Sequence, residues 1–180
     1  MNVKEAIYAR RSVRKYQDRA VEAGKLEELA RLGAAAPSAH NRKPWVFLLA
    51  NDPDTMERVR TATLFGRFGA PAAIVVCGDR RRMMPLAARD FWVQDCSAAI
   101  ENILLGAVEM GLGAVWLGCW PLKQGGDRLR AHLNLPDHLE PLGTVYLGYP
   151  AEEHEPRTQW EDGMTLWVKD LPGGKGEKGD

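Results

Sequence analysis

The chain has 180 residues, and its 24 Lys and Arg residues balance 24 Asp and Glu residues, which leaves no formal net charge at pH 7. This length suffices for one domain with a substantial core. The charge balance argues against a protein that attracts nucleic acid or anionic lipid through its overall charge, so any basic residues that matter must act locally.

The cysteines and the N-terminus indicate a reduced, cytoplasmic environment. Cys77, Cys96 and Cys119 lie far apart in apolar stretches and form no CxxC or Cys/His metal spacing, so we expect buried, reduced thiols. The first residues (MNVKE) carry charge where a signal peptide is apolar. The apolar runs fall short of the ~20 residues that a membrane-spanning helix needs. We therefore expect a cytoplasmic protein.

The first third of the chain predicts helices around one buried strand. An Asn-x-x-Glu capping pattern predicts a short helix over residues 2–10, and the alternation after it predicts an extended segment over residues 13–17. Apolar spacing predicts an amphipathic helix around residues 26–32. Residues 45–49 predict a buried strand, and Asp52-Pro53 is typical of a helix start.

The remainder alternates between strands and helices. Residues 71–77 form an unbroken apolar run that predicts a strand. Residues 86–110 form the longest helical pattern, apolar on more than one face, which predicts a central, buried helix. A strand over 114–118, a polar helix over 126–133 and a strand over 143–147 follow.

This order of elements predicts the fold class but not the strand order. Alternating long helices and strands with few hairpin signals favour an α+β or α/β domain, with a sheet packed against the long central helix. We expect a single domain over residues 1–170. Residues 171–180 are rich in Gly and Lys and predict a disordered tail.

An arginine-rich motif, RRSVRKY, spans residues 10–16 at a predicted helix-to-strand junction. Guanidinium groups match phosphate oxygens in geometry and charge, and a serine hydroxyl adds a further donor. The candidate anion-binding residues are Arg10, Arg11, Ser12 and Arg14. A bare Arg-Arg pair would be a solvated basic patch, but the full string favours anion binding without identifying the anion.

Further segments offer weaker contacts to a ligand. Residues 37–45 (PSAHNRKPW) form a proline-bounded loop with short polar side chains, a composition that also suits a plain connecting turn. Residues 113–118 (GAVWLG) contain glycines that let a backbone pass close to a ligand. Arg157 offers another cation in a polar segment. Asp95 and Cys96 lack identifiable catalytic partners and are interpreted as structural.

The chain also lacks several well-known nucleotide and catalytic motifs. It contains no GxGxxG after a strand, no GxxxxGK[ST] and no GxSxG. These absences argue against a Rossmann dinucleotide site, a P-loop NTPase and an α/β-hydrolase.

Taken in order, the motifs resemble those of the nitroreductase family of FMN-dependent oxidoreductases. The similarity runs from about Ala6 to Trp160 and is carried by RRSVRKY, APSAHNRKPW, WVQDCSAAIENILLGAVEMGLGAVWLG and the LGYP turn with Arg157 beyond it. Each motif alone is weak, whereas four in register are specific. The resemblance implies an α+β homodimer with a central mixed sheet flanked by helices. Its two active sites would lie at the subunit interface, which the helix over residues 86–110 would largely form.

The resemblance also implies how FMN is held. The arginine-rich motif would bind the FMN phosphate and ring edge, Arg157 would reach the phosphate, and the proline-serine loop would contact the isoalloxazine from the other subunit. The Trp-Leu-Gly segment would lie alongside the flavin. The implied cofactor-binding residues are Arg10, Arg11, Ser12, Arg14, Pro37, Ser38, Ala39, Asn41, Trp116, Leu117, Gly118 and Arg157. It implies no catalytic side chain and no metal.

The implied activity is a ping-pong transfer of electrons from NAD(P)H to a nitroaromatic, quinone or similar electron-poor acceptor. The alternatives are an FMN enzyme with a narrow substrate, such as a dehalogenase or an enoyl-type reductase, a non-enzymatic flavin-binding protein, and a structural dimer that binds another anion. Lys43 stands where the family often has glutamine. It either favours reduced flavin or an acidic substrate, or points to solvent. The physiological acceptor and the choice between NADH and NADPH stay open.

Overall fold

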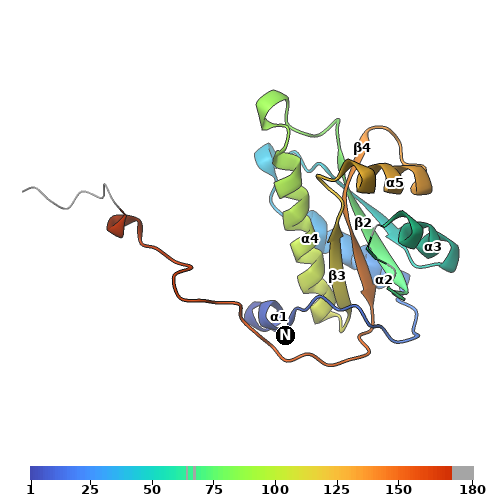
Figure 1. Cartoon of the computed structure of the whole chain (residues 1–180), viewed down its shortest axis with the longest axis horizontal. Coiled ribbons are helices and arrows are strands. Elements are labelled where there is room, and N and C mark those ends of the chain that lie inside the picture. The colour runs from blue at the N-terminus through green and yellow to red at the C-terminus, as the bar shows by residue number, and fades with distance from the viewer. Residues whose placement is uncertain (64, 67, 172–180) are drawn as a thin grey trace, which may run out of the picture.

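The computed structural model describes residues 1–63, 65, 66 and 68–171, and it has an α+β fold in which helices cover both faces of one sheet (Figure 1). The strands lie in the order β1-β2-β4-β3, and each neighbouring pair is antiparallel. These four strands are therefore antiparallel, whereas the resemblance implies a mixed sheet. Strand patterns in a sequence carry no direction, so they do not predict which of the two occurs. Among the described residues, the one parallel bridge is an isolated contact between Ser12 and Ala114. The strands are β1 (Trp45–Ala50), β2 (Ala72–Asp79), β3 (Gly113–Gly118) and β4 (Leu139–Gly148).

Two apolar clusters, one on each face of the sheet, form the core. Side chains of β2 alternate between them: Ile74 and Val76 face the cluster with α2 and α4, and Val75 faces the cluster with α3 and α5. Because both faces of β2 are covered, its sequence is an unbroken apolar run. The α-helices are α1 (Val3–Ala9), α2 (Ala23–Ala34), α3 (Pro53–Ala62), α4 (Phe91–Glu109) and α5 (Lys123–Leu133). Short 3-10 helices are η1 (Ala39–Asn41), η2 (Leu86–Ala88) and η3 (Val168–Asp170).

The central helix is buried as predicted, but it begins later than its apolar pattern indicates. Leu86 has a φ of +51°, which a right-handed α-helix cannot contain, and it is the first residue of the short η2 turn. The regular helix α4 therefore starts at Phe91 instead of Leu86. At its other end, Gly106 permits close packing on α2, because an added Cβ would lie 2.5 Å from a methyl carbon of Leu32.

Other predicted boundaries follow the local chemistry of the sequence. The Asn2–Glu5 capping box is present at α1, and Asp52 accepts a hydrogen bond of 2.9 Å from the backbone of Thr55 at the start of α3. Strand β4 begins four residues before the predicted position 143, because Pro141 lies at a register shift against β2 where proline is tolerated. Likewise, α5 begins at residue 123 rather than at the predicted 126.

The three cysteines are buried and free, as predicted. Burial raises the pKa of Cys96 to about 12 and the pKa of Cys119 to about 11. Among the described residues, no helix combines the length and the apolarity that crossing a bilayer requires. Apart from Leu171, the predicted tail over residues 171–180 lies outside the described residues.

Replacing Gly143 with alanine tests the packing between β3 and β4. An added Cβ would lie 2.5 Å from Nε1 of Trp116 and 2.7 Å from the carbonyl oxygen of Leu117. Because that oxygen belongs to the paired strand, we expect Gly143→Ala to lower the free energy of unfolding by about 1–3 kcal/mol in urea denaturation. Gly24→Ala is the control, since no atom lies within 4 Å of its Cβ position in α2. Equal stability of the two variants would contradict this packing.

Candidate functional site

The arginine-rich motif leaves α1 as an extended segment along β3. Helix α1 ends at Ala9, and Arg10 has extended backbone angles, with φ −57° and ψ 131°. Further along, the N–H of Val13 donates to the carbonyl of Ala114 at 3.0 Å, and Ser12 forms a bridge to the same residue. The edge of the sheet therefore fixes the path of the motif.

The two outer arginines of this segment have different neighbours. Ser12 and Arg14 are exposed on its outer side, whereas Val13 is buried. Nη1 of Arg14 donates to the carbonyl of Ser12 at 3.2 Å, and its guanidinium lies 6.0 Å from the centre of the Phe68 ring. Nε of Arg10 lies 3.5 Å from a carboxylate oxygen of Glu101, and both side chains are partly exposed, so the pair contributes little to stability.

Arg11 lies on the other side, and backbone carbonyls occupy its guanidinium. It donates to the carbonyls of Tyr8 at 3.0 Å and Arg10 at 2.7 Å, and also to that of Glu155. Burial lowers the pKa of Arg11, and the nearby cations Arg157 and Arg10 lower it further. The side chain thus ties the segment after β4 to the end of α1.

Arg157 meets the motif from the C-terminal segment. Its backbone N–H donates to the carbonyl of Tyr8 at 3.0 Å. A cavity of 170 Å³ is lined by Arg10, Arg11 and Arg157, together with neighbours that include Tyr8 and Thr158. The structure therefore brings Arg157 to the arginine-rich motif, as the sequence predicts.

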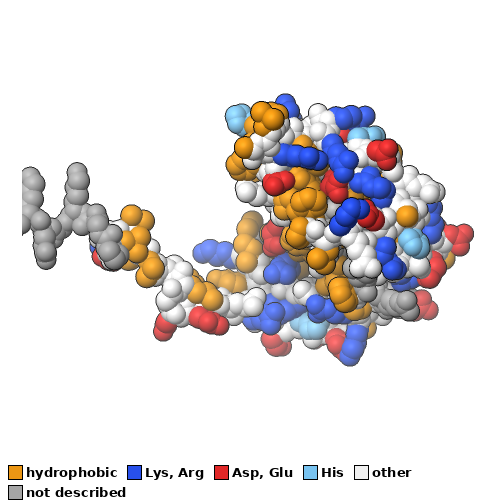
Figure 2. All heavy atoms as spheres, turned by 45° about the horizontal axis from the view of Figure 1, so that its top comes forward, with side chains coloured by type: hydrophobic (Ala, Val, Ile, Leu, Met, Phe, Trp, Pro, Cys, Tyr) orange, Lys and Arg blue, Asp and Glu red, His pale blue; other side chains and the backbone are white. Residues whose placement is uncertain are grey.

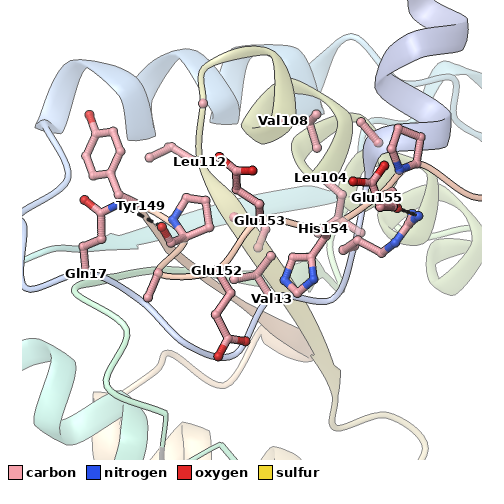
Figure 3. Close-up of a pocket in the computed structure, with 18 of the residues that line it drawn as sticks. Val13, Gln17, Leu104, Val108, Leu112, Tyr149, Glu152, Glu153, His154 and Glu155 are labelled. Carbon is pink, nitrogen blue, oxygen red and sulfur yellow. Dashed lines mark hydrogen bonds between the residues drawn. The ribbon is translucent and has the colours of Figure 1, made fainter.

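A larger cavity of 710 Å³ lies between the segment after β4 and the body of the protein (Figure 3). Leu104, Val108 and Leu112 supply apolar parts of its wall, and the opposing segment carries Glu152 and Glu153. Carboxylates repel a phosphate, so the size of this cavity does not make it the better anion site.

The proline-serine loop has an unusual backbone. His40, Asn41 and Lys43 have φ values of +50°, +55° and +50°, in the left-handed region that most side chains disfavour. Such conformations persist only where the surroundings enforce them, and they cluster at functional sites.

Two hydrogen bonds enforce this backbone. The Ser38 hydroxyl accepts from the N–H of Lys43 at 3.0 Å, which closes the loop. Asp95, buried in α4, accepts from the N–H of Ala39 at 2.8 Å. The structural interpretation of Asp95 therefore agrees with the fold, although no local pattern identifies its partner.

The Trp-Leu-Gly segment is the far end of β3. From Ala114 beside the arginine-rich motif, the strand runs about 13 Å to Gly118, at 3.3 Å per residue. Among the described residues, Nε1 of Trp116 and the hydroxyl of Thr144 are buried without a hydrogen-bond partner. Thr144 lines a cavity of 20 Å³ with Leu117 and Gly118, enough for about one water molecule.

The predicted site residues fall into two groups within one chain. The arginine-rich motif meets α4 at Glu101, and the proline-serine loop meets it at Asp95. Glu101 follows Asp95 by six residues, so along the helix the two side chains are separated by a rise of about 9 Å and point in directions about 120° apart. Arg10, Arg11 and Arg157 line one cavity and the motif pairs with the start of β3, whereas Asp95 holds Ala39 of the proline-serine loop near the start of α4. No cluster of potential metal ligands occurs among the described residues.

The structure has an α+β fold with a cationic segment at the edge of its sheet and a long buried helix. This fold agrees with the class of flavin-dependent oxidoreductases that the resemblance implies. The family model for the nitroreductase family matches residues 7–66 and 63–149. The chain belongs to this family.

Individual relatives agree with this assignment. A protein of Archaeoglobus fulgidus, provisionally named NADH dehydrogenase/NAD(P)H nitroreductase, is 41% identical over 151 residues, which are 83% of this chain and 86% of the relative. A crystal structure from Parabacteroides distasonis with the same provisional name has a TM-score of 0.85 and 38% identity, and covers 93% of this chain and 99% of its own. A provisionally named nitroreductase from Desulfovibrio desulfuricans, solved in complex with FMN, has a TM-score of 0.77 and 30% identity. The match covers 96% of this chain and 99% of the other chain.

Proposed function

We propose that the protein is an FMN-dependent oxidoreductase that transfers electrons from NAD(P)H to an electron-poor acceptor such as a nitroaromatic or a quinone. Family membership and the FMN complex of a relative with 30% identity support this function. The observation that carries it is the cavity that Arg10, Arg11 and Arg157 line, next to the segment that pairs with β3 at Ser12.

These residues suit FMN in charge and in arrangement. Arg10, Arg14 and Arg157 supply guanidinium groups for the phosphate, and Ser12 adds a hydroxyl donor. β3 leads from this cluster to Gly118, so an elongated ligand that starts at the arginines lies along the Trp-Leu-Gly segment. In this arrangement Arg11 organises the cradle instead of contacting the phosphate, because carbonyl groups occupy its guanidinium.

We expect a ping-pong order, in which NAD(P)H leaves before the acceptor enters. FMN, when bound, supplies the redox chemistry, and the protein contributes orientation and electrostatics. No thiol competes as a nucleophile among the described residues, since the three cysteines are buried and burial raises each pKa.

We also propose a homodimer with FMN at the subunit interface. Because the arginine-rich motif and the proline-serine loop contact different faces of α4, a flat ligand on one face meets both only if a second chain provides the loop. The C-terminal segment supports the same assembly. It runs away from the body of the protein in Figure 1. Its apolar side chains Trp160, Leu166 and Trp167 are 58–76% exposed, and exposed apolar surface of this kind is typical of a protein–protein interface.

The assembly is tested by light scattering on the purified protein. We expect a particle of twice the 20.0 kDa chain mass, and a shift toward the single-chain mass when Trp160 and Trp167 are both replaced by serine. A wild-type particle of single-chain mass that retains flavin would contradict the composite site.

Removing two arginines tests the phosphate site. We expect the double variant Arg10→Ala/Arg14→Ala to be purified without FMN, because it loses two charge-assisted contacts, each worth about 1.5–3 kcal/mol. Arg31→Ala is the control, since Arg31 is exposed on α2 and pairs with Glu27 and Glu28 of its own helix. Flavin content is measured by absorbance after heat release. Full FMN occupancy in the double variant would overturn the assignment.

A further inference from the structure

Cations gather at the end of the molecule where α4 begins. Residues 40–43 and 79–90 contain six Lys or Arg residues and only two Asp residues, although the whole chain is neutral. In Figure 1 both segments lie at the same end of the fold. Figure 2 shows Lys and Arg side chains beside hydrophobic ones on the face turned forward. A local excess of this kind attracts anions.

Reciprocal hydrogen bonds clasp the two segments together. The guanidinium of Arg42 donates to the carbonyls of Arg82 at 3.0 Å and Met83 at 2.9 Å. The guanidinium of Arg82 donates back to the carbonyl of Lys43 at 3.3 Å. The clasp therefore holds Lys43 and the residues after β2 in a fixed relation to the proline-serine loop.

Only part of this charge is neutralised within the chain. Asp79 pairs with Arg81 at 2.7 Å, and Glu140 pairs with Arg80. Other cations of the two segments are exposed and have no carboxylate within ion-pair distance among the residues that the structure describes. These are Arg42, Lys43, Arg82 and Arg89.

Aromatic surface adjoins these cations. The ring of Trp120 lies 5.3 Å from that of buried Trp92 in an edge-on arrangement. Trp92 and Met83 both pack against Gly78, where an added Cβ would lie 2.5 Å and 2.7 Å from them. Because Met83 is part of the clasp and Trp92 contacts Trp120, Trp120 lies at the same end of the molecule as the clasp. Trp120 is 39% exposed, and Phe91 at the start of α4 is 43% exposed.

We propose that the acceptor is an aromatic compound that carries a carboxylate or a similar anionic group, and that Lys43, held beside Arg82 by the clasp, binds this group. The inference rests on the proposed function, because the loop that would meet the flavin also carries Lys43. Ser38 and Lys43 are joined by the 3.0 Å hydrogen bond that closes the loop. For a nitro acceptor, one NAD(P)H and one proton are consumed, and NAD(P)⁺, the nitroso compound and water are formed, while the carboxylate is unchanged.

The test compares 4-nitrobenzoate with 4-nitrobenzamide, which differ in charge but little in size. For the FMN-loaded wild-type protein we expect a higher kcat/KM for the carboxylate. The variant Lys43→Gln should lower kcat/KM for the carboxylate by about fivefold, through KM, and leave the amide unaffected. Arg31→Gln, which removes one exposed charge from α2, should change neither value. Added salt should weaken only the reaction of the carboxylate.

The outcomes separate this inference from the proposed function. Equal kcat/KM for the two acceptors, or an equal loss for both in Lys43→Gln, overturns the anionic acceptor and leaves the reductase in place. If the variant instead has a lower kcat/KM for NADPH and an unchanged kcat/KM for the acceptors, the cations bind the phosphate of the electron donor, and the inference is also overturned. Failure of FMN-loaded protein to reduce either compound with NADPH or NADH overturns the proposed function as well.

Discussion

The arrangement of the arginine-rich motif depends on the close approach of Val13 to Gly113 at the start of β3. A Cβ on Gly113 would lie 2.7–2.8 Å from side-chain atoms of Val13, so only glycine leaves room for this contact. With Val13 buried and its N–H paired to Ala114, the motif follows the edge of the sheet, and Ser12 and Arg14 stay exposed. The proposed phosphate site is in this sense a consequence of strand pairing rather than of the arginines alone.

Helix α4 relates this motif to the rest of the proposed site. Asp95 near its start holds the backbone of the proline-serine loop, and Glu101 meets Arg10 six residues later on another face. One buried helix thus positions both segments. In the homodimer that we propose, the two segments of a site come from different chains, so assembly and cofactor binding are coupled.

The sequence predicts elements well where the signal is local and poorly where distant residues decide. The capping box at Asn2 and the cap at Asp52 depend on residues three positions apart, and both are present. The start of α4 and the start of β4 depend instead on the backbone of Leu86 and on a register shift at Pro141, and periodicity reports neither. Repeating side chains predict which face is buried, not where strain or a bulge interrupts an element.

The same distinction holds in the candidate site. The sequence identifies Arg11 and Arg157 equally as cations, and only the folded chain shows that both line a cavity with Arg10 and that carbonyl groups accept from Arg11. The clasp between Arg42 and Arg82 joins residues forty positions apart and leaves no local pattern. The central claim, that these residues hold a flavin that NAD(P)H reduces, is tested most directly by the absorbance spectrum of the purified protein before and after anaerobic addition of NADPH or NADH. The account predicts an FMN spectrum that bleaches without any acceptor and returns when a quinone is added. A colourless protein that takes up no added FMN, or bound flavin that neither nucleotide bleaches, would contradict it.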